Sequence, residues 1–144
     1  MGEKPIRILF VCTGNSCRSQ MAEGWARELG AGRVETYSAG VDPIPLAPFT
    51  VQVMAEAGVD ISAQRSKSVD EFLGEEFDYI ITLCDNAREN CPYFPGAARR
   101  LHWPVDDPHG RDVDAYRRAR DDLRARVAAF LEELEESPPG DDQT

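Results

Sequence analysis

The sequence has no long hydrophobic run. Its first apolar stretch, IRILFV at residues 6–11, follows a charged, proline-containing start. The stretch is shorter than the core of a signal peptide or a membrane-spanning helix. We therefore expect a cytoplasmic protein with no membrane partner.

An excess of positive charge is also missing. The chain carries 16 Lys and Arg against 26 Asp and Glu, a formal net charge of −10, and no basic stripe is visible along it. Nucleic-acid binding needs Lys and Arg clustered on one face, so we expect no nucleic-acid partner. The acidity gathers towards the C-terminal end, and a small anion can still bind through local dipoles.

The sequence shows no internal repeat and no linker. Its 144 residues fit one domain with a substantial core. We expect residues 1–136 to form that domain, as a monomer, and residues 137–144 to be a disordered tail. Static disulfides are rare in a reducing cytoplasm, so the four cysteines are expected to be free, metal-bound or redox-active.

Apolar periodicity alternates between strand and helix along the chain. FDYIITLC, for example, is a near-continuous apolar run that suits a central parallel strand. We expect strands at 6–11, 34–40, 77–84 and 99–105, and helices at 16–30, 48–58 (with Val51, Met54 and Ala55 inward), 69–73 and 113–134. This order predicts a doubly wound α/β fold with a parallel sheet of roughly four strands flanked by helices.

The segment CTGNSCRS, residues 12–19, joins the first expected strand to the first expected helix. Ligands of open α/β sheets bind beyond the carboxyl ends of strands. Gly14 permits a tight turn and Asn15 tolerates left-handed backbone, so successive N–H groups can point inward as a cradle. The pattern predicts a tetrahedral-oxyanion site formed by Thr13, Gly14, Asn15, Ser16, Cys17, Arg18 and Ser19.

Cys12 ends the strand at the edge of this loop. A helix N-terminus and a nearby arginine both stabilise a thiolate, so we expect Cys12 to be a nucleophile that accepts a hydrogen bond from Ser19. The alternative is a buried strand-end cysteine, with Arg18 at the surface. For Cys17, inside the loop, we favour packing without a chemical role.

The spacing C-x5-R after a strand, together with DDP at 106–108, resembles the low-molecular-weight protein tyrosine phosphatases. The resemblance implies that Asp107 is the general acid that protonates the departing oxygen. Without the loop, Asp106 and Asp107 would simply begin a turn. His102 and His109 stand alone in the sequence and are interpreted as structural or solvent-facing.

Two further cysteines are more than a phosphatase needs. Cys84 ends an expected central strand, which places it at the same sheet edge as Cys12, and Cys91 follows after the polar stretch DNAREN. The segment 85–95 ends in the breaker-rich PYFPG, which predicts weak packing and the ability to rearrange.

With these cysteines the chain resembles the thioredoxin-coupled arsenate reductases built on the phosphatase fold. The matching stretches are CTGNSCRSQMAEGWA, SAG at 38–40, TLCDNARENCP and HWPVDDP, and the likeness runs from Ile6 to about Leu134. The resemblance implies arsenate as substrate, no cofactor, no metal, and thioredoxin as partner, with mycothiol or glutaredoxin as alternative thiol donors.

The resemblance also implies a role for each catalytic residue. Cys12 attacks arsenic(V) held by Arg18 and the loop, while Asp107 assists loss of an oxygen. Cys84 then attacks Cys12 and arsenite leaves. Finally Cys91 attacks Cys84, which frees the first cysteine and leaves a disulfide for thioredoxin to reduce. The chain between the last two cysteines would have to loop out, because a rigid helix holds their sulfurs apart.

Some members of this family bind potassium near the loop through positions that match Asn15, Glu23, Ser38 and an acidic residue. The fourth position is Lys67 here. Its ammonium group can take the cation's place, so we expect no dependence on potassium. Glu23 is expected to order Asn15 through a hydrogen bond, and solvated surface charge is the alternative for Glu23 and Lys67.

Three other functions compete with arsenate reduction. A low-molecular-weight protein tyrosine phosphatase accounts for the loop and Asp107 but leaves Cys84 and Cys91 unused. A four-cysteine zinc site fits poorly, since C-x4-C and C-x6-C differ from the usual zinc-knuckle spacing. A thiol-based redox sensor would leave the anion loop idle.

Overall fold

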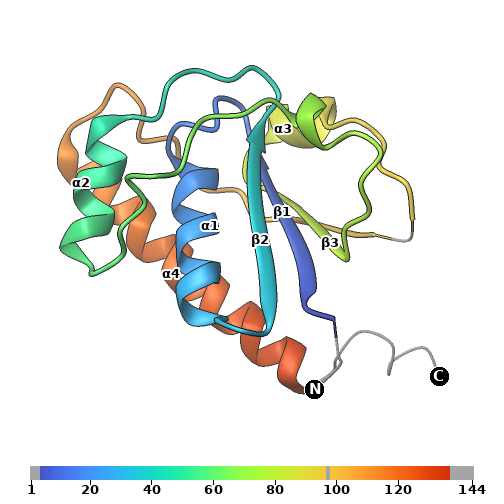
Figure 1. Cartoon of the computed structure of the whole chain (residues 1–144). Coiled ribbons are helices and arrows are strands. Elements are labelled where there is room, and N and C mark those ends of the chain that lie inside the picture. The colour runs from blue at the N-terminus through green and yellow to red at the C-terminus, as the bar shows by residue number, and fades with distance from the viewer. Residues whose placement is uncertain (1–3, 97, 137–144) are drawn as a thin grey trace.

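The computed structural model describes residues 4–96 and 98–136; the expected tail at 137–144 lies outside them. Strands and helices alternate along the chain (Figure 1). The elements are β1 (Ile6–Cys12), α1 (Arg18–Leu29), β2 (Val34–Gly40), α2 (Pro48–Glu56), the 3-10 helix η1 (Val69–Phe72), β3 (Tyr79–Thr82), α3 (Asp85–Asn90), β4 (Arg99–His102) and α4 (Val113–Glu136).

The four strands form one parallel sheet in the order β2-β1-β3-β4, which confirms the predicted fold class. β1 is central, and its residues from Ile8 to Cys12 are almost completely buried. Cys12 pairs with Gly40 of β2, and Val11 pairs with Thr82 of β3. The carboxyl ends of these strands therefore meet at one edge.

The two faces of the sheet are covered unequally. α1, α2 and α4 lie on one face (Figure 1), and the larger core there includes Trp25, Met54 and Leu123. The smaller core on the other face includes residues of η1 and Ala87 of α3, together with Phe94. The segment 85–95 therefore packs on the face of the sheet that has the smaller core.

Several boundaries differ from those expected. β4 ends at His102 instead of residue 105, although the N–H groups of Trp103 and Val105 still donate to the carbonyls of Thr82 and Leu83. β3 covers four residues and α1 begins only at Arg18, after the loop. In α2 the buried side chains are Thr50, Val53 and Met54, so the expectation for Ala55 was wrong: it lies on the exposed side.

The stretch DNAREN, expected to be weakly packed and able to rearrange, is the helix α3. Cys84 is its N-cap and Cys91 its C-cap. Between residues 85 and 95 only Ala87 and Phe94 are buried. Weak packing is therefore found, but in a short helix.

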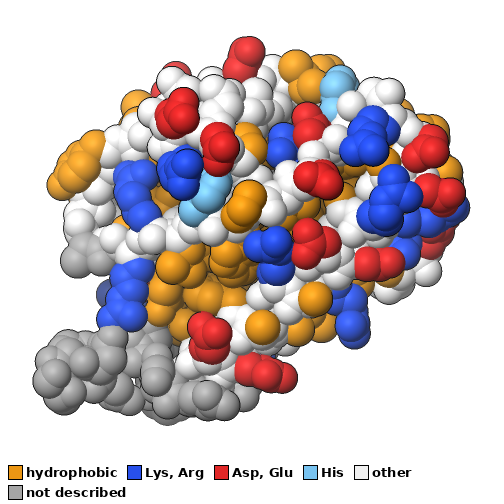
Figure 2. All heavy atoms as spheres, turned by 180° about the vertical axis from the view of Figure 1, so that it is seen from behind, with side chains coloured by type: hydrophobic (Ala, Val, Ile, Leu, Met, Phe, Trp, Pro, Cys, Tyr) orange, Lys and Arg blue, Asp and Glu red, His pale blue; other side chains and the backbone are white. Residues whose placement is uncertain are grey.

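Charged side chains are interspersed over the face seen in Figure 2, where Lys and Arg alternate with Asp and Glu and form no continuous basic patch. Among residues 4–96 and 98–136, no helix is long and apolar enough to cross a membrane.

Candidate active site

The loop after β1 turns its carbonyl groups outward. Those of Cys12, Thr13 and Gly14 accept hydrogen bonds from the backbone of residues 41–44, at 2.8–3.1 Å. Within the described part of the chain, no backbone carbonyl accepts from the N–H groups of Gly14, Ser16, Cys17 and Arg18. These N–H groups are left for a ligand, which agrees with the predicted cradle.

Asn15 holds the loop in shape. It is the one non-glycine residue with a positive φ in the described chain, at 49°, which confirms the expected left-handed conformation. Its Nδ2 donates to Ser19 Oγ (2.8 Å) and to Ser38 Oγ (3.0 Å). Its Oδ1 accepts from the Lys67 N–H (2.8 Å) and from Gln20 Nε2 (3.1 Å). All the polar atoms of this buried side chain therefore have partners.

Gly40, at the end of β2, lets the neighbouring strand touch the loop. A Cβ atom at this position would lie 2.6 Å from the Thr13 carbonyl oxygen and 2.9 Å from the Asn15 nitrogen. No side chain fits there without moving the loop backbone. The motif SAG is visible in the sequence, but the sequence alone does not show why its third residue must be glycine.

Two donors face the Cys12 sulfur. Ser19 Oγ lies 2.9 Å from it and the Asn15 N–H donates to it at 3.3 Å. Asn15 Nδ2 is a donor only, so the single hydroxyl proton of Ser19 is directed to the sulfur. The expected hydrogen bond between Ser19 and the Cys12 sulfur is confirmed.

Arg18 is buried, with 7% of its surface exposed. Its Nη1 donates to the Val105 carbonyl at 3.0 Å, and its Nη2 lies 3.5 Å from Asp107 Oδ2. Arg18 Nε is the one buried side-chain nitrogen or oxygen of the described residues without a hydrogen-bond partner. A buried donor of this kind is costly unless an acceptor satisfies it, and an oxyanion would do so.

A cavity of about 180 Å³ opens at the loop. It brings Cys12, Arg18 and Asp107 to one place although Asp107 is far along the chain. Its lining is Cys12, Thr13, Gly14, Ser16, Cys17, Arg18, Asp42, Ile44, Asp107 and His109. His109, interpreted from the sequence as isolated, is therefore a cavity residue, and its backbone N–H donates to Asp107 Oδ1 at 3.0 Å.

Cys17 is buried on the side of the loop that faces α2 and α4. Burial raises the pKa of its thiol, opposed by hydrogen bonds with Thr50, Ser16 and Tyr116. Burial and the neighbouring Cys17 raise the pKa of Tyr116 to about 12. A thiol held in its neutral form and surrounded by packing contacts fits the packing role favoured for Cys17, even though it also lines the cavity.

Cys84 lies at the same sheet edge as Cys12, as predicted. Leu83, the residue before it, donates its N–H to the Val11 carbonyl. The sulfur of Cys84 is 3.3 Å from Thr13 Oγ1, so it contacts the loop directly. The second cysteine is therefore held beside the first residue after Cys12.

Cys91 is not at the cavity. It packs with Cys84, Ala87 and Phe94 around the smaller core, and burial raises the pKa of its thiol, opposed by Arg100. Seven positions of helix separate the Cα atoms of Cys84 and Cys91 by about 10 Å. A disulfide needs them within about 7 Å, so α3 as it stands keeps the two apart.

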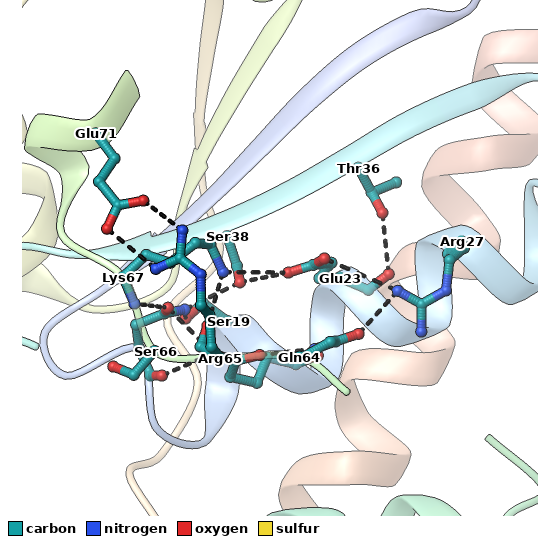
Figure 3. A network of polar contacts seen from close by, with 12 residues as sticks. Ser19, Glu23, Arg27, Thr36, Ser38, Gln64, Arg65, Ser66, Lys67 and Glu71 are labelled. Atoms are coloured by element: carbon teal, nitrogen blue, oxygen red, sulfur yellow. Dashed lines mark hydrogen bonds and ion pairs between the residues drawn. The ribbon is translucent and has the colours of Figure 1, made fainter. Parts of the chain in front are cut away.

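Lys67 and Glu23 form a poorly exposed pair near the loop (Figure 3). Their side chains are 12% and 13% exposed, and Nζ lies 4.0 Å from Glu23 Oε1. Burial lowers the pKa of Lys67, opposed by Glu23. Glu23 is connected to Asn15 through Ser38, which donates to Glu23 Oε1 at 2.6 Å and accepts from Asn15 Nδ2 at 3.0 Å, so the expected hydrogen bond runs by way of a serine. Independence from potassium stays a prediction.

His102 is not isolated either. Its Nε2 lies 3.0 Å from Asp85 Oδ1 and its Nδ1 lies 2.7 Å from Thr82 Oγ1. The ring therefore ties β4 to β3 and to the first residue of α3, in keeping with a structural interpretation. In the described chain no three His, Cys, Asp or Glu residues group closely enough to hold a metal ion, so the zinc alternative gains no support.

Fold and site together define an α/β protein with a C-x5-R loop between its first strand and first helix, and with a cysteine, an arginine and an aspartate around one cavity. The chain belongs to the low molecular weight phosphotyrosine protein phosphatase family, whose model matches residues 7–139.

Within this family the chain is similar to arsenate reductases. It is 42% identical over 131 residues to the arsenate reductase of Halalkalibacterium halodurans, which covers 87% of this chain and 94% of that one. A solved arsenate reductase in the oxidized state matches with a TM-score of 0.80 at 32% identity, over 89% of this chain and 98% of that one. A low molecular weight protein tyrosine phosphatase from T. tengcongensis matches with a TM-score of 0.76 at 29% identity, over 90% and 99%.

Proposed function

We propose that this protein reduces arsenate to arsenite, in the service of arsenic detoxification, with thioredoxin as its electron donor. The similarity to arsenate reductases supports the substrate. The contact between Cys84 and the loop carries the mechanism, because a phosphatase has no use for a second thiol 3.3 Å from Thr13 Oγ1. The two electrons come from thiols, so no cofactor is needed.

The first step is the attack of the Cys12 thiolate on arsenic(V). A sulfur–arsenic bond forms and one arsenate oxygen departs as water. Arg18 and the N–H groups of the loop hold the oxyanion, and Asp107 gives the proton to the departing oxygen. The product is a covalent Cys12–arsenic(V) adduct.

In the second step the Cys84 thiolate attacks the sulfur of Cys12. The new disulfide forms as the sulfur–arsenic bond breaks, and the electron pair of that bond stays on arsenic, which leaves as arsenite. The third step is attack by Cys91 on Cys84, which expels the Cys12 thiolate. α3 unwinds for this step, and the dithiol of thioredoxin then returns two electrons and two protons to the disulfide.

The test replaces Cys12, Cys84 and Cys91 singly by serine. With thioredoxin, thioredoxin reductase and NADPH, each variant should lose multiple turnover of arsenate. Without thioredoxin, Cys91→Ser should still release one arsenite per chain, whereas Cys84→Ser should release none. Urea unfolding of each variant controls for folding.

Full multiple turnover by Cys84→Ser or Cys91→Ser would contradict the relay. A chain that hydrolyses phosphate esters rapidly and reduces no arsenate would instead be a phosphatase, the function that the match to the T. tengcongensis enzyme favours. We expect phosphatase activity to be present only as a weak side reaction.

A further inference from the structure

A row of side-chain hydrogen bonds connects α3 to the sulfur of Cys84. Asn90 Nδ2 donates to Asn86 Oδ1 at 2.8 Å, and Asn86 Nδ2 donates to Thr13 Oγ1 at 3.0 Å. Thr13 Oγ1 in turn lies 3.3 Å from Cys84 Sγ. The row begins on the surface of the helix and ends on a reacting atom.

The direction of each bond follows from the groups involved. Asn90 fixes the Asn86 amide with its oxygen towards Asn90 and its nitrogen towards Thr13. Thr13 Oγ1 accepts from that nitrogen, and its one proton is then directed to Cys84 Sγ. The Ala87 N–H also donates to this sulfur, at 3.4 Å. Two donors therefore face Cys84, as two face Cys12.

We propose that Asn86 is a positioning residue for the second step of the proposed arsenate reduction, and that it acts through Thr13. By holding the Thr13 hydroxyl it supports Cys84 as the attacking thiolate. The arrangement repeats the one at Cys12, where the Asn15 amide orients the Ser19 hydroxyl. The inference rests on the proposed function, since it concerns the attack by Cys84.

The place of Asn86 in α3 limits this support to one stage of the reaction. Asn86 is the second residue of the helix, so its contact with Thr13 lasts only while α3 is folded. Once α3 unwinds to bring Cys91 to Cys84, the Asn86 amide no longer donates to the Thr13 hydroxyl. Cys84 is then no longer supported as a nucleophile and becomes the sulfur that is attacked.

The experiment measures a single turnover in the Cys91→Ser chain, where arsenite release reports the second step. Asn86→Ala should slow the maximal rate about threefold to tenfold, the usual worth of one hydrogen bond. The arsenate concentration for half-maximal rate should stay the same. Asn86→Asp should slow the step at least as much, because its carboxylate accepts the Thr13 proton. Glu89→Gln, on the same helix, is the matched control and should keep the parent rate.

The pH profile separates positioning from a loss of structure. In both Asn86 variants the rise of the rate with pH should move to higher pH, while the urea midpoint stays that of the parent chain. The titratable neighbours of the site, Asp85 and His102, are unchanged in every variant. Thr13→Val should remove the effect: adding Asn86→Ala to Thr13→Val should slow the step no further.

Equal maximal rates for Asn86→Ala and the parent, or an equal loss in Glu89→Gln, would overturn the proposal while leaving the reductase function intact. An unmoved pH profile, or additive effects with Thr13→Val, would also overturn it. If the Cys91→Ser parent itself releases no arsenite, the proposed function fails and the role of Asn86 fails with it.

Discussion

Two cysteine-bearing segments leave the same edge of the sheet and are held very differently. In the loop 12–19 every residue except Thr13 and Gly14 is buried, and Asn15 and Arg18 tie the loop to the rest of the chain. In the segment 84–95 only Ala87 and Phe94 are buried. The contrast fits a site in which the first sulfur needs a fixed geometry and the later sulfurs need to move.

The physical reasons are local. The loop lies between a central strand and a helix of twelve residues. Its carbonyls at Cys12, Thr13 and Gly14 accept from neighbouring backbone, and that of Asn15 accepts from the Gln20 side chain. α3 has six residues, far fewer than a helix needs to be stable alone. It is held by one buried alanine and by side-chain contacts at its first turn, through Asn86 and through Asp85 with His102.

The largest effect expected belongs to the rigid region. Asp107→Asn should lower the rate of the first step about 10²- to 10⁴-fold, the usual contribution of a general acid. Asp106→Asn, one residue away and outside the cavity lining, is the matched control and should stay within about twofold of the parent. Rapid-quench measurement of arsenite release in one turnover reports both. Equal rates for the two variants would remove Asp107 from the mechanism.

Amide hydrogen exchange should separate the two segments directly. We expect the amides of α3 to exchange at least about a hundredfold faster than those in the middle of α1, since local opening free energies scale with packing. Mass spectrometry of the reduced protein measures both helices in one sample. Similar protection would mean that α3 does not open easily, and the relay would then need another source of motion.

Gly40→Ala tests how little room the loop has. The added methyl group meets the Thr13 carbonyl, so the free energy of unfolding should fall by about 1–3 kcal/mol. Glu89→Ala on the surface of α3 should change it by less than about 0.5 kcal/mol. Urea unfolding of both variants makes the comparison, and an unaffected Gly40→Ala protein would show that the loop can shift.

The smallest effect expected concerns potassium. With Lys67 already beside Glu23, the reductase rate and the melting temperature should be the same in KCl and NaCl at equal ionic strength. Steady-state assays and thermal melts in the two salts measure this. A clear rise in either quantity with potassium would mean that the ammonium group does not substitute for the cation.

Much of the site could be predicted because it is continuous in sequence. The apolar run of β1, Asn15 with its tolerance for left-handed backbone, and the arginine at a fixed spacing lie within a few residues of each other. Gly40 and His109 could not be found in this way, since their importance comes from atoms that only the fold brings near. The helix α3 was not predicted, because its residues are polar and are followed by helix-breaking residues. Its capping by the Cys84 side chain is visible only in the structure.

By itself the sequence determined an alternating α/β chain, a loop able to hold an oxyanion after the first strand, a further cysteine at a second strand end and another cysteine after a polar stretch. These follow from periodicity and from short-range stereochemistry, which act between near neighbours in the chain. Only the tertiary structure decided that Asp107 and His109 share the cavity of Cys12, that Cys84 contacts Thr13, and that Cys91 is held away from both. Such facts depend on which strands pair and how helices pack, and packing acts between residues far apart in sequence.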